Sequence, residues 1–136
     1  MSLSFQSIEV RTGCKKEQDA MAVKRVVANI ASPDTGKAQS FYGDVLGMDL
    51  AMDHGWIVTF AGERGAMAQV SVAAEGGAGT PVPDFSVEVD NLEEVLEKVQ
   101  AKGLGIEYGP ADEPWGVRRF YVRDPFGRLV NILQHA

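Results

Sequence analysis

The sequence predicts an α+β domain made of two similar halves. Each half contains one segment with helical spacing, and each helical segment is flanked by strand-like segments. The second half ends in a strand, a tight turn and another strand, and a related strand sequence ends the first half. These three observations indicate an internal duplication.

The hairpin near the C-terminal end is the clearest element. Residues 119–123 and 129–133 are rich in branched and aromatic side chains, and the turn at 124–127 has proline second and glycine fourth. Side chains alternate between the two faces of a strand. One face of the last strand is therefore apolar, and the other carries a single amide, that of Asn131.

Two helices of matching length are predicted at 34–47 and 90–103. Ser32 is expected to cap the first helix, and Asp90 or Asn91 the second, with a capping box completed by a glutamate three positions on. The side chains expected to face the core are Ala38, Phe41, Tyr42, Val45 and Leu46 in the first helix and Leu92, Val95, Leu96 and Val99 in the second.

The duplication also aligns the strands that end each half. Residues 64–70 match residues 126–132, which places Gln69 opposite Asn131. Other strands are expected at 24–31, near Leu50, and at 56–60, 66–73, 85–89 and 117–123.

The halves are joined by a linker at 75–83 that is rich in glycine and proline. No helix follows its glycines and no Lys-Ser or Lys-Thr pair is present, which argues against a phosphate-binding loop. The domain is expected to occupy residues 22–136, with modules at about 22–74 and 84–136. Residues 1–21 are expected to be an N-terminal extension, either a leader or an arm that pairs with a sheet edge or a neighbouring subunit.

Composition favours a globular protein. The chain has 136 residues, of which 45% are hydrophobic and 24% charged, and this is enough to bury one core. Its net charge of -6 and its lack of basic clusters argue against nucleic-acid and membrane partners. The single cysteine, Cys14, cannot form an intrachain disulfide, so we expect a cytoplasmic protein.

The chain resembles the vicinal oxygen chelate superfamily, which includes glyoxalases, extradiol dioxygenases and bleomycin-resistance proteins. The resemblance covers roughly residues 22–135. It rests on Phe-Tyr-Gly-Asp-Val-Leu-Gly-Met at 41–48, on residues 85–90 and on residues 124–134. Glu-Pro-Trp-Gly at 113–116, followed by Arg119 and Phe120, is most similar to the bleomycin-resistance branch.

This resemblance implies two βαβββ modules that form one curved, mostly antiparallel eight-stranded sheet with helices on its outer face. The concave face would enclose the site. The side chains expected to face the helices are Val26, Ala28, Ile30, Val70, Val72, Phe85, Val87, Val130 and Ile132. The opposite face is expected to carry Val27, Asn29, Gln69, Ser71, Asp84, Ser86, Glu88 and Asn131, and such polar side chains need water or a ligand as partners. An exposed sheet face or a polar subunit interface is the alternative.

Enzymes of this superfamily hold a divalent metal at four matched strand positions. Here these positions are Val27, Gln69, Asp84 and Asn131, a set with one carboxylate and no imidazole. Such ligands suit zinc, nickel or iron poorly. The histidines, His54 and His135, lie elsewhere and are expected at the surface. We therefore expect no metal, no other cofactor and no catalytic residues.

The favoured hypothesis is binding without turnover, in which the protein sequesters a small, antibiotic-like molecule. Trp56 and Trp115 would stack on a planar or cationic guest, Trp115 from the rim of the cavity, while Asp84 and Glu88 would favour a basic one. The expected binding residues are Asn29, Trp56, Gln69, Ser71, Asp84, Ser86, Glu88, Trp115 and Asn131. A metal-dependent lyase, isomerase or dioxygenase and a ligand-free scaffold remain alternatives. The resemblance also implies a homodimer.

Overall fold

The computed structural model describes residues 21–62 and 68–136. The expectations for residues 1–20, including Cys14, lie outside this part of the chain. One sheet organises the fold, with strand order β2-β3-β4-β1-β5-β8-β7-β6. The strands of the first half are β1 (Val23–Ala31), β2 (Asp49–Asp53), β3 (Ile57–Ala61) and β4 (Gln69–Ala73), and those of the second half are β5 (Phe85–Val89), β6 (Ile106–Asp112), β7 (Val117–Arg123) and β8 (Leu129–His135).

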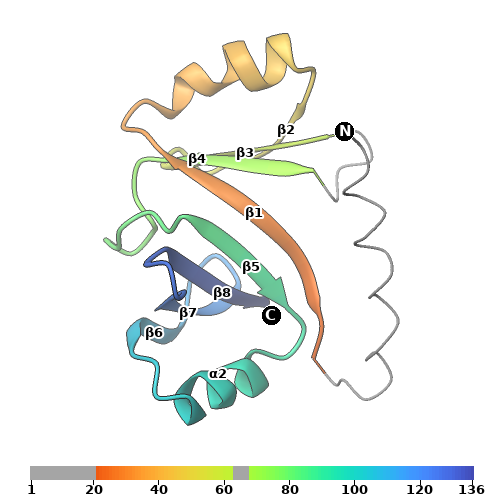
Figure 1. Cartoon of the computed structure of the whole chain (residues 1–136). Coiled ribbons are helices and arrows are strands. Elements are labelled where there is room, and N and C mark those ends of the chain that lie inside the picture. Colours follow the sequence, from red (N-terminus) through yellow and green to blue (C-terminus); the bar gives the residue numbers. More distant parts are fainter. Residues whose placement is uncertain (1–20, 63–67) are drawn as a thin grey trace.

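Each half forms a βαβββ module of the same topology. β1 pairs in parallel with β4, and β5 pairs in parallel with β8, while the other pairs within the modules are antiparallel. β1 and β5 pair antiparallel and so join the modules within one chain. The predicted α+β fold is therefore confirmed, and Figure 1 shows the sheet curving between helical segments at opposite ends of the molecule.

The helix of the second module, α2 (Leu92–Ala101), forms as predicted. Asn91 caps it, with its Oδ1 accepting a hydrogen bond from the backbone N–H of Glu94 at 3.2 Å. Leu92 and Leu96 are buried, and Val95 and Val99 pack against the same core cluster. The apolar face of α2 is therefore buried against the strands of its own module.

The first helix differs from the prediction. A 3₁₀ turn, η2 (Thr35–Lys37), is followed by a π-helical segment, η3 (Gln39–Val45), whose wider winding appears in the 3.0 Å hydrogen bond from the Leu46 N–H to the Phe41 carbonyl. The winding turns part of the expected core face outward. Ala38 is buried and Tyr42 packs beside it, but the side chains of Phe41, Val45 and Leu46 are exposed.

The outer face of β1 is a second departure. Val26, Ala28 and Ile30 were expected to lie beneath a helix, but all three are exposed. The helical segment of the first module lies over β3 and β4, and α2 lies over β5, β7 and β8, so the central strand β1 is left between them (Figure 1). The opposite face of β1 has Val27 buried and faces the interior of the curve.

The hairpin β7–β8 has its predicted turn. The Gly127 N–H donates to the Asp124 carbonyl at 3.1 Å, and Gly127 has a φ of 84°. β6 was not located from the sequence, because Gly109 and Pro110 interrupt its alternation and its pairing with β7 shifts register there. No helix within residues 21–62 and 68–136 is long and apolar enough to span a membrane.

Candidate functional site

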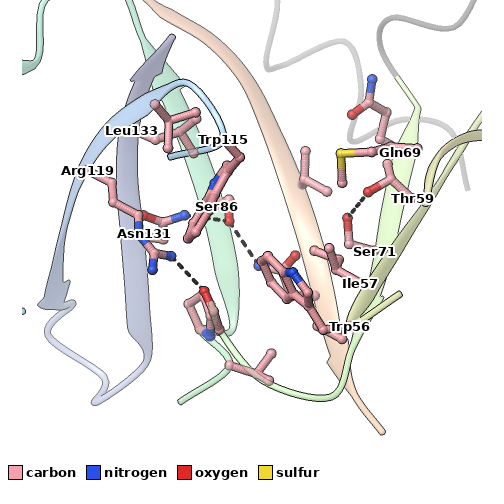
Figure 2. Close-up of a pocket in the computed structure, with 18 of the residues that line it drawn as sticks. Trp56, Ile57, Thr59, Gln69, Ser71, Ser86, Trp115, Arg119, Asn131 and Leu133 are labelled. Carbon is pink, nitrogen blue, oxygen red and sulfur yellow. Dashed lines mark hydrogen bonds between the residues drawn. The ribbon is translucent and has the colours of Figure 1, made fainter. Parts of the chain in front are cut away.

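The concave face of the sheet holds a cavity of about 270 Å³. Both modules contribute to it, as Figure 2 shows. The predicted binding residues that line it are Asn29, Trp56, Gln69, Ser71, Ser86, Trp115 and Asn131. The alternation of side chains along β1, β4, β5 and β8 places the polar members of this set on one face.

Asp84 and Glu88 do not line the cavity. Asp84 precedes β5, and its Oδ2 accepts a hydrogen bond from the Leu129 N–H at 2.8 Å, which ties the start of β8 to β5. Glu88 lies near the other end of β5 between the side chains of Arg25 and His135. The ionisable residues lining the cavity are instead Arg25, Glu75, Arg119 and His135, so the expectation of an acidic cavity for a basic guest is not supported.

The carboxylate of Glu88 is held beside the cavity by two lining residues, Arg25 and His135. Its Oε1 lies 2.5 Å from Arg25 Nε, and its Oε2 lies 2.8 Å from His135 Nδ1. Arg25 also donates a hydrogen bond to the side-chain oxygen of Gln69. Burial alone would raise the pKa of Glu88, but the hydrogen bonds and charges of His135 and Arg25 outweigh burial and hold this pKa below its usual value.

The two tryptophans meet at one end of the cavity. Their ring centroids are 5.4 Å apart with the planes inclined at 63°, an edge-to-face contact, and His54 stacks on Trp56. Both indoles reach Gly77 in the linker, where an added Cβ would lie 2.7 Å from Trp115 Cη2 and 2.9 Å from Trp56 Cη2. The indoles touch each other, so a planar guest would stack against them from the cavity and not between them.

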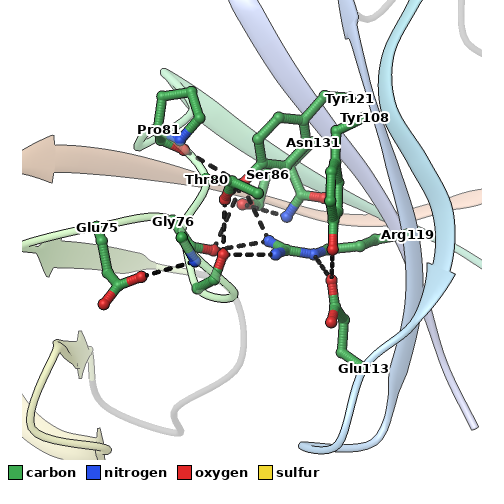
Figure 3. A network of polar contacts seen from close by, with 12 residues as sticks. Glu75, Gly76, Thr80, Pro81, Ser86, Tyr108, Glu113, Arg119, Tyr121 and Asn131 are labelled. Atoms are coloured by element: carbon green, nitrogen blue, oxygen red, sulfur yellow. Dashed lines mark hydrogen bonds and ion pairs between the residues drawn. The ribbon is translucent and has the colours of Figure 1, made fainter.

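Arg119 fixes the linker over this end of the cavity (Figure 3). Its guanidinium is buried and donates to Glu113 Oε2 at 2.8 Å, to the Gly76 carbonyl at 2.8 Å and to the Gly77 carbonyl at 3.2 Å. Its Cζ lies 5.1 Å from the ring centroid of Trp115. One side chain therefore positions both the linker glycines and an indole of the site.

A second group of contacts holds the far end of the linker. The hydroxyls of Thr80 and Tyr121 lie 2.8 Å apart, and the Tyr121 hydroxyl also lies 3.0 Å from Arg119 Nη1. Thr80 donates to the Gly77 carbonyl at 2.8 Å. The linker is thus fastened to β7 at two places, which fixes the end wall of the cavity.

Glu113 balances the buried charge of Arg119. Its pKa would be raised by burial, but hydrogen bonds from Tyr108 and Arg119 and the charge of Arg119 lower it below the usual value. The Tyr108 hydroxyl donates to Glu113 Oε2 at 2.7 Å. That hydrogen bond raises the pKa of Tyr108, with burial adding to the effect.

A row of polar side chains crosses the centre of the sheet. Asn29 on β1, Ser86 on β5 and Asn131 on β8 are adjacent, and Nδ2 of each asparagine donates to Ser86 Oγ, at 3.0 Å from Asn29 and 3.1 Å from Asn131. On the other wall, the hydroxyls of Thr59 and Ser71 lie 2.7 Å apart. The predicted polar residues are therefore partly satisfied by one another.

The residues at the superfamily's metal positions do not fit a divalent metal. Val27 has no donor atom, the carboxylate of Asp84 accepts from the Leu129 backbone, and the Gln69 oxygen accepts from Arg25. Within the described part of the chain, no three His, Cys, Asp or Glu side chains are grouped to hold an ion. Asn131 supplies only an amide, so no chemical step is assigned to a metal here.

Sequence reasoning missed the importance of Arg119, Arg25 and His135 in the cavity wall. The alternation along β7 gave the signal, because Arg119 shares a face with Val117 and Tyr121. His135 was expected to be an ordinary surface residue, and it is exposed, but it also reaches Glu88. A charged residue on an inward face of a strand has to find a partner, and here each does.

Comparison with solved structures identifies the fold. A structure described as a NAD-dependent benzaldehyde dehydrogenase from Legionella pneumophila matches 82% of this chain and 99% of its own, with a TM-score of 0.65 and 14% identity. A glyoxalase/bleomycin resistance protein/dioxygenase superfamily member from Vibrio splendidus matches 85% and 100%, with a TM-score of 0.58 and 21% identity. Methylmalonyl-CoA epimerase from Mycobacterium tuberculosis matches 84% and 87%, with a TM-score of 0.58 and 19% identity.

These identities show a shared fold and carry no activity to this chain. No curated protein matches it. The family profile described as "Glyoxalase/Bleomycin resistance protein/Dioxygenase superfamily" matches residues 23–132, which include all the strands described above except the end of β8. The chain belongs to the glyoxalase/bleomycin resistance protein/dioxygenase superfamily.

Proposed function

We propose that the protein binds a small planar molecule in the cavity and sequesters it, without a metal and without chemical turnover. The observation that carries this proposal is the pair of indoles, Trp56 and Trp115, at one end of a cavity that both modules line. Aromatic side chains with a few convergent polar groups are typical of small-molecule sites. An antibiotic-like guest is compatible with this lining.

The ionisable side chains of the cavity support binding over catalysis, because each already has a partner. Arg25 and His135 share Glu88, Arg119 is paired with Glu113, and Glu75 Oε1 accepts from the Gly79 N–H at 3.0 Å. A general base or acid has to exchange a proton with a bound substrate. Side chains fixed in this way are better suited to shaping the cavity than to proton transfer.

Intrinsic fluorescence tests the proposal directly, because the only two tryptophans in the chain both line the cavity. Titration with quinoline, a neutral planar probe at pH 8, should quench the emission to saturation. Trp115→Ala should weaken binding about three- to tenfold, the effect of losing one stacking contact. Phe126→Ala, which removes the aromatic ring of a residue that is 85% exposed on the hairpin turn, is the matched control and should bind as the wild type does.

Two results would contradict this function. Quinoline binding that is unchanged in Trp115→Ala, with the fold intact by circular dichroism, would make the indole a packing residue. Near-stoichiometric metal in protein purified without chelator, together with metal-dependent lyase, isomerase or dioxygenase activity, would favour an enzyme.

We also propose that the protein is a homodimer. The support is the exposed apolar surface on the outer side of β1, where Val23 is 55%, Val26 51% and Ile30 40% exposed. Apolar side chains grouped on one surface are typical of protein interfaces. Sedimentation of the full chain should give twice 14.7 kDa, and Val26→Lys should shift it toward 14.7 kDa. A wild-type monomer at micromolar concentration would contradict the dimer.

A further inference from the structure

We propose that Ser86 and Asn131 form a polar anchor for an amide group of the guest, so that the cavity selects neutral planar molecules that carry a cyclic or primary amide. This inference rests on the proposed function, because it assigns the guest's chemistry within the same cavity. Both residues line the cavity, and they lie side by side on β5 and β8.

The hydrogen bonds around Ser86 leave its hydroxyl proton free to donate to a guest. A hydroxyl has one proton to donate and two lone pairs that accept. Ser86 Oγ accepts from Asn29 Nδ2 at 3.0 Å and from Asn131 Nδ2 at 3.1 Å, so both lone pairs are engaged. In this arrangement the hydroxyl proton is directed to neither amide.

Within the described part of the chain, Asn131 lacks a hydrogen-bond donor for its side-chain oxygen, just as Ser86 lacks an acceptor for its proton. Asn131 is only 7% exposed, and its Oδ1 is buried without a hydrogen-bond partner among residues 21–62 and 68–136. A buried acceptor without a partner is unfavourable, because it has lost its water and gained nothing in exchange. A guest that brings a donor to this point is therefore favoured over one that brings only apolar atoms.

The orientation of the Asn131 amide explains why the guest should carry both a donor and an acceptor. If the amide is turned by half a rotation, its oxygen accepts the Ser86 proton and its NH₂ group becomes the one without a partner. One polar atom of Asn131 stays unpaired in either orientation. A ketone, an ether or a ring nitrogen pairs only with the turned amide and makes one hydrogen bond. An amide pairs with the first orientation and makes two, because its N–H donates to Asn131 Oδ1 and its carbonyl accepts the Ser86 proton.

The charges of the wall favour a neutral guest. Arg119 is buried against Glu113, and Arg25 is paired with Glu88, so neither the cations nor the carboxylates are left to neutralise a charged ligand. Burying an unpaired charge is costly. With a volume of about 270 Å³, the cavity suits a small guest, and the indoles favour a flat one.

Three probes separate this anchor from stacking alone. Quinoline has no amide, 2-quinolinone has a cyclic amide, and N-methyl-2-quinolinone keeps the carbonyl but lacks the N–H. Calorimetry on the full chain should show 2-quinolinone binding about tenfold more tightly than quinoline, as one or two added hydrogen bonds would give. N-methylation should remove most of this gain.

Variants locate the effect. Asn131→Leu and Ser86→Ala should each lower the affinity for 2-quinolinone to that for quinoline in the same variant. Ser40→Ala, which removes an exposed hydroxyl of η3 bonded to the Lys37 carbonyl, is the control and should keep the preference. If Asn131→Leu does not fold, the side-chain ¹⁵N signal of Asn131 in the wild type provides the test and should shift when 2-quinolinone is added, but much less with quinoline.

The outcomes distinguish the two proposals. Equal binding of all three probes to the wild type, or an unmoved Asn131 signal, would overturn the anchor and leave planar binding in place. A preference for 2-quinolinone that survives in both variants would also overturn it. If none of the three probes quenches the tryptophans or releases heat, the proposed function fails, and the anchor fails with it.

Discussion

Helix α2 of the second module packs Leu92 and Leu96 into its own core, whereas the first module exposes Phe41 and Val45 of η3 and the adjoining Leu46. The modules share one topology, so the difference lies in the winding and packing of these segments. The second module also contains the buried pair of Arg119 and Glu113, to which the linker is fastened. The two modules of this duplicated fold therefore differ in role. The second buries the apolar face of its helix and holds the linker, whereas the first presents apolar side chains at the surface.

The largest effect should come from the buried ion pair of the second module. Arg119→Met leaves Glu113 buried without its cation and should lower the free energy of unfolding by about 3–5 kcal/mol. Arg123→Met is the matched control, because Arg123 and Glu107 pair at 2.9 Å with 48% and 44% of their side chains exposed. It should cost under about 1 kcal/mol. Urea unfolding measures both, and equal losses would show that the buried pair has no special role.

The two helical segments give the next comparison. Leu92 is fully buried, so Leu92→Ala should lower the free energy of unfolding by about 2–5 kcal/mol. Leu46 is 55% exposed, so Leu46→Ala should stay within about 0.5 kcal/mol. Thermal unfolding at several protein concentrations checks both. A large, concentration-dependent loss in Leu46→Ala would show that a partner covers η3.

Sequence predicted most of the second module, because its elements follow local rules. Asn91 is a capping residue at the start of an apolar stripe, and the turn at 124–127 has the residues that its geometry needs. In the first module, the spacing of Phe41, Val45 and Leu46 predicted a buried α-helical face. Spacing alone does not reveal π-helical winding. The exposure of the outer face of β1 depends on where η3 and α2, which are distant in sequence, pack on the sheet.

The residues of the candidate site also fall into those that sequence placed correctly and those that it did not. Strand alternation found Asn29, Ser86 and Asn131, because residues two apart share a face wherever the strand goes. It also placed Asp84 and Glu88 there, but Asp84 lies just before β5 and bonds the backbone of Leu129. Which polar side chains find partners depends on neighbours across the sheet, and those contacts are not contained in the periodicity of one strand.

The smallest expected effect is on the pH dependence of the free energy of unfolding, and it comes from Glu113 of the second module. The pKa of Glu113 in the folded protein is lowered, because the hydrogen bonds from Tyr108 and Arg119 and the charge of Arg119 outweigh burial. In the unfolded chain the pKa of this carboxyl is about 4.3. The carboxylate's contribution is therefore complete above that pH and is lost as the pH falls through the folded-state pKa. Glu113→Gln should be less stable at pH 7, and its free energy of unfolding should fall less steeply below pH 5.

Glu107→Gln, which alters the exposed partner of Arg123, should keep the wild-type slope. An acid slope in Glu113→Gln as steep as in the wild type would place the acid sensitivity elsewhere, with Glu88 at the seam between the modules as the next carboxylate to replace.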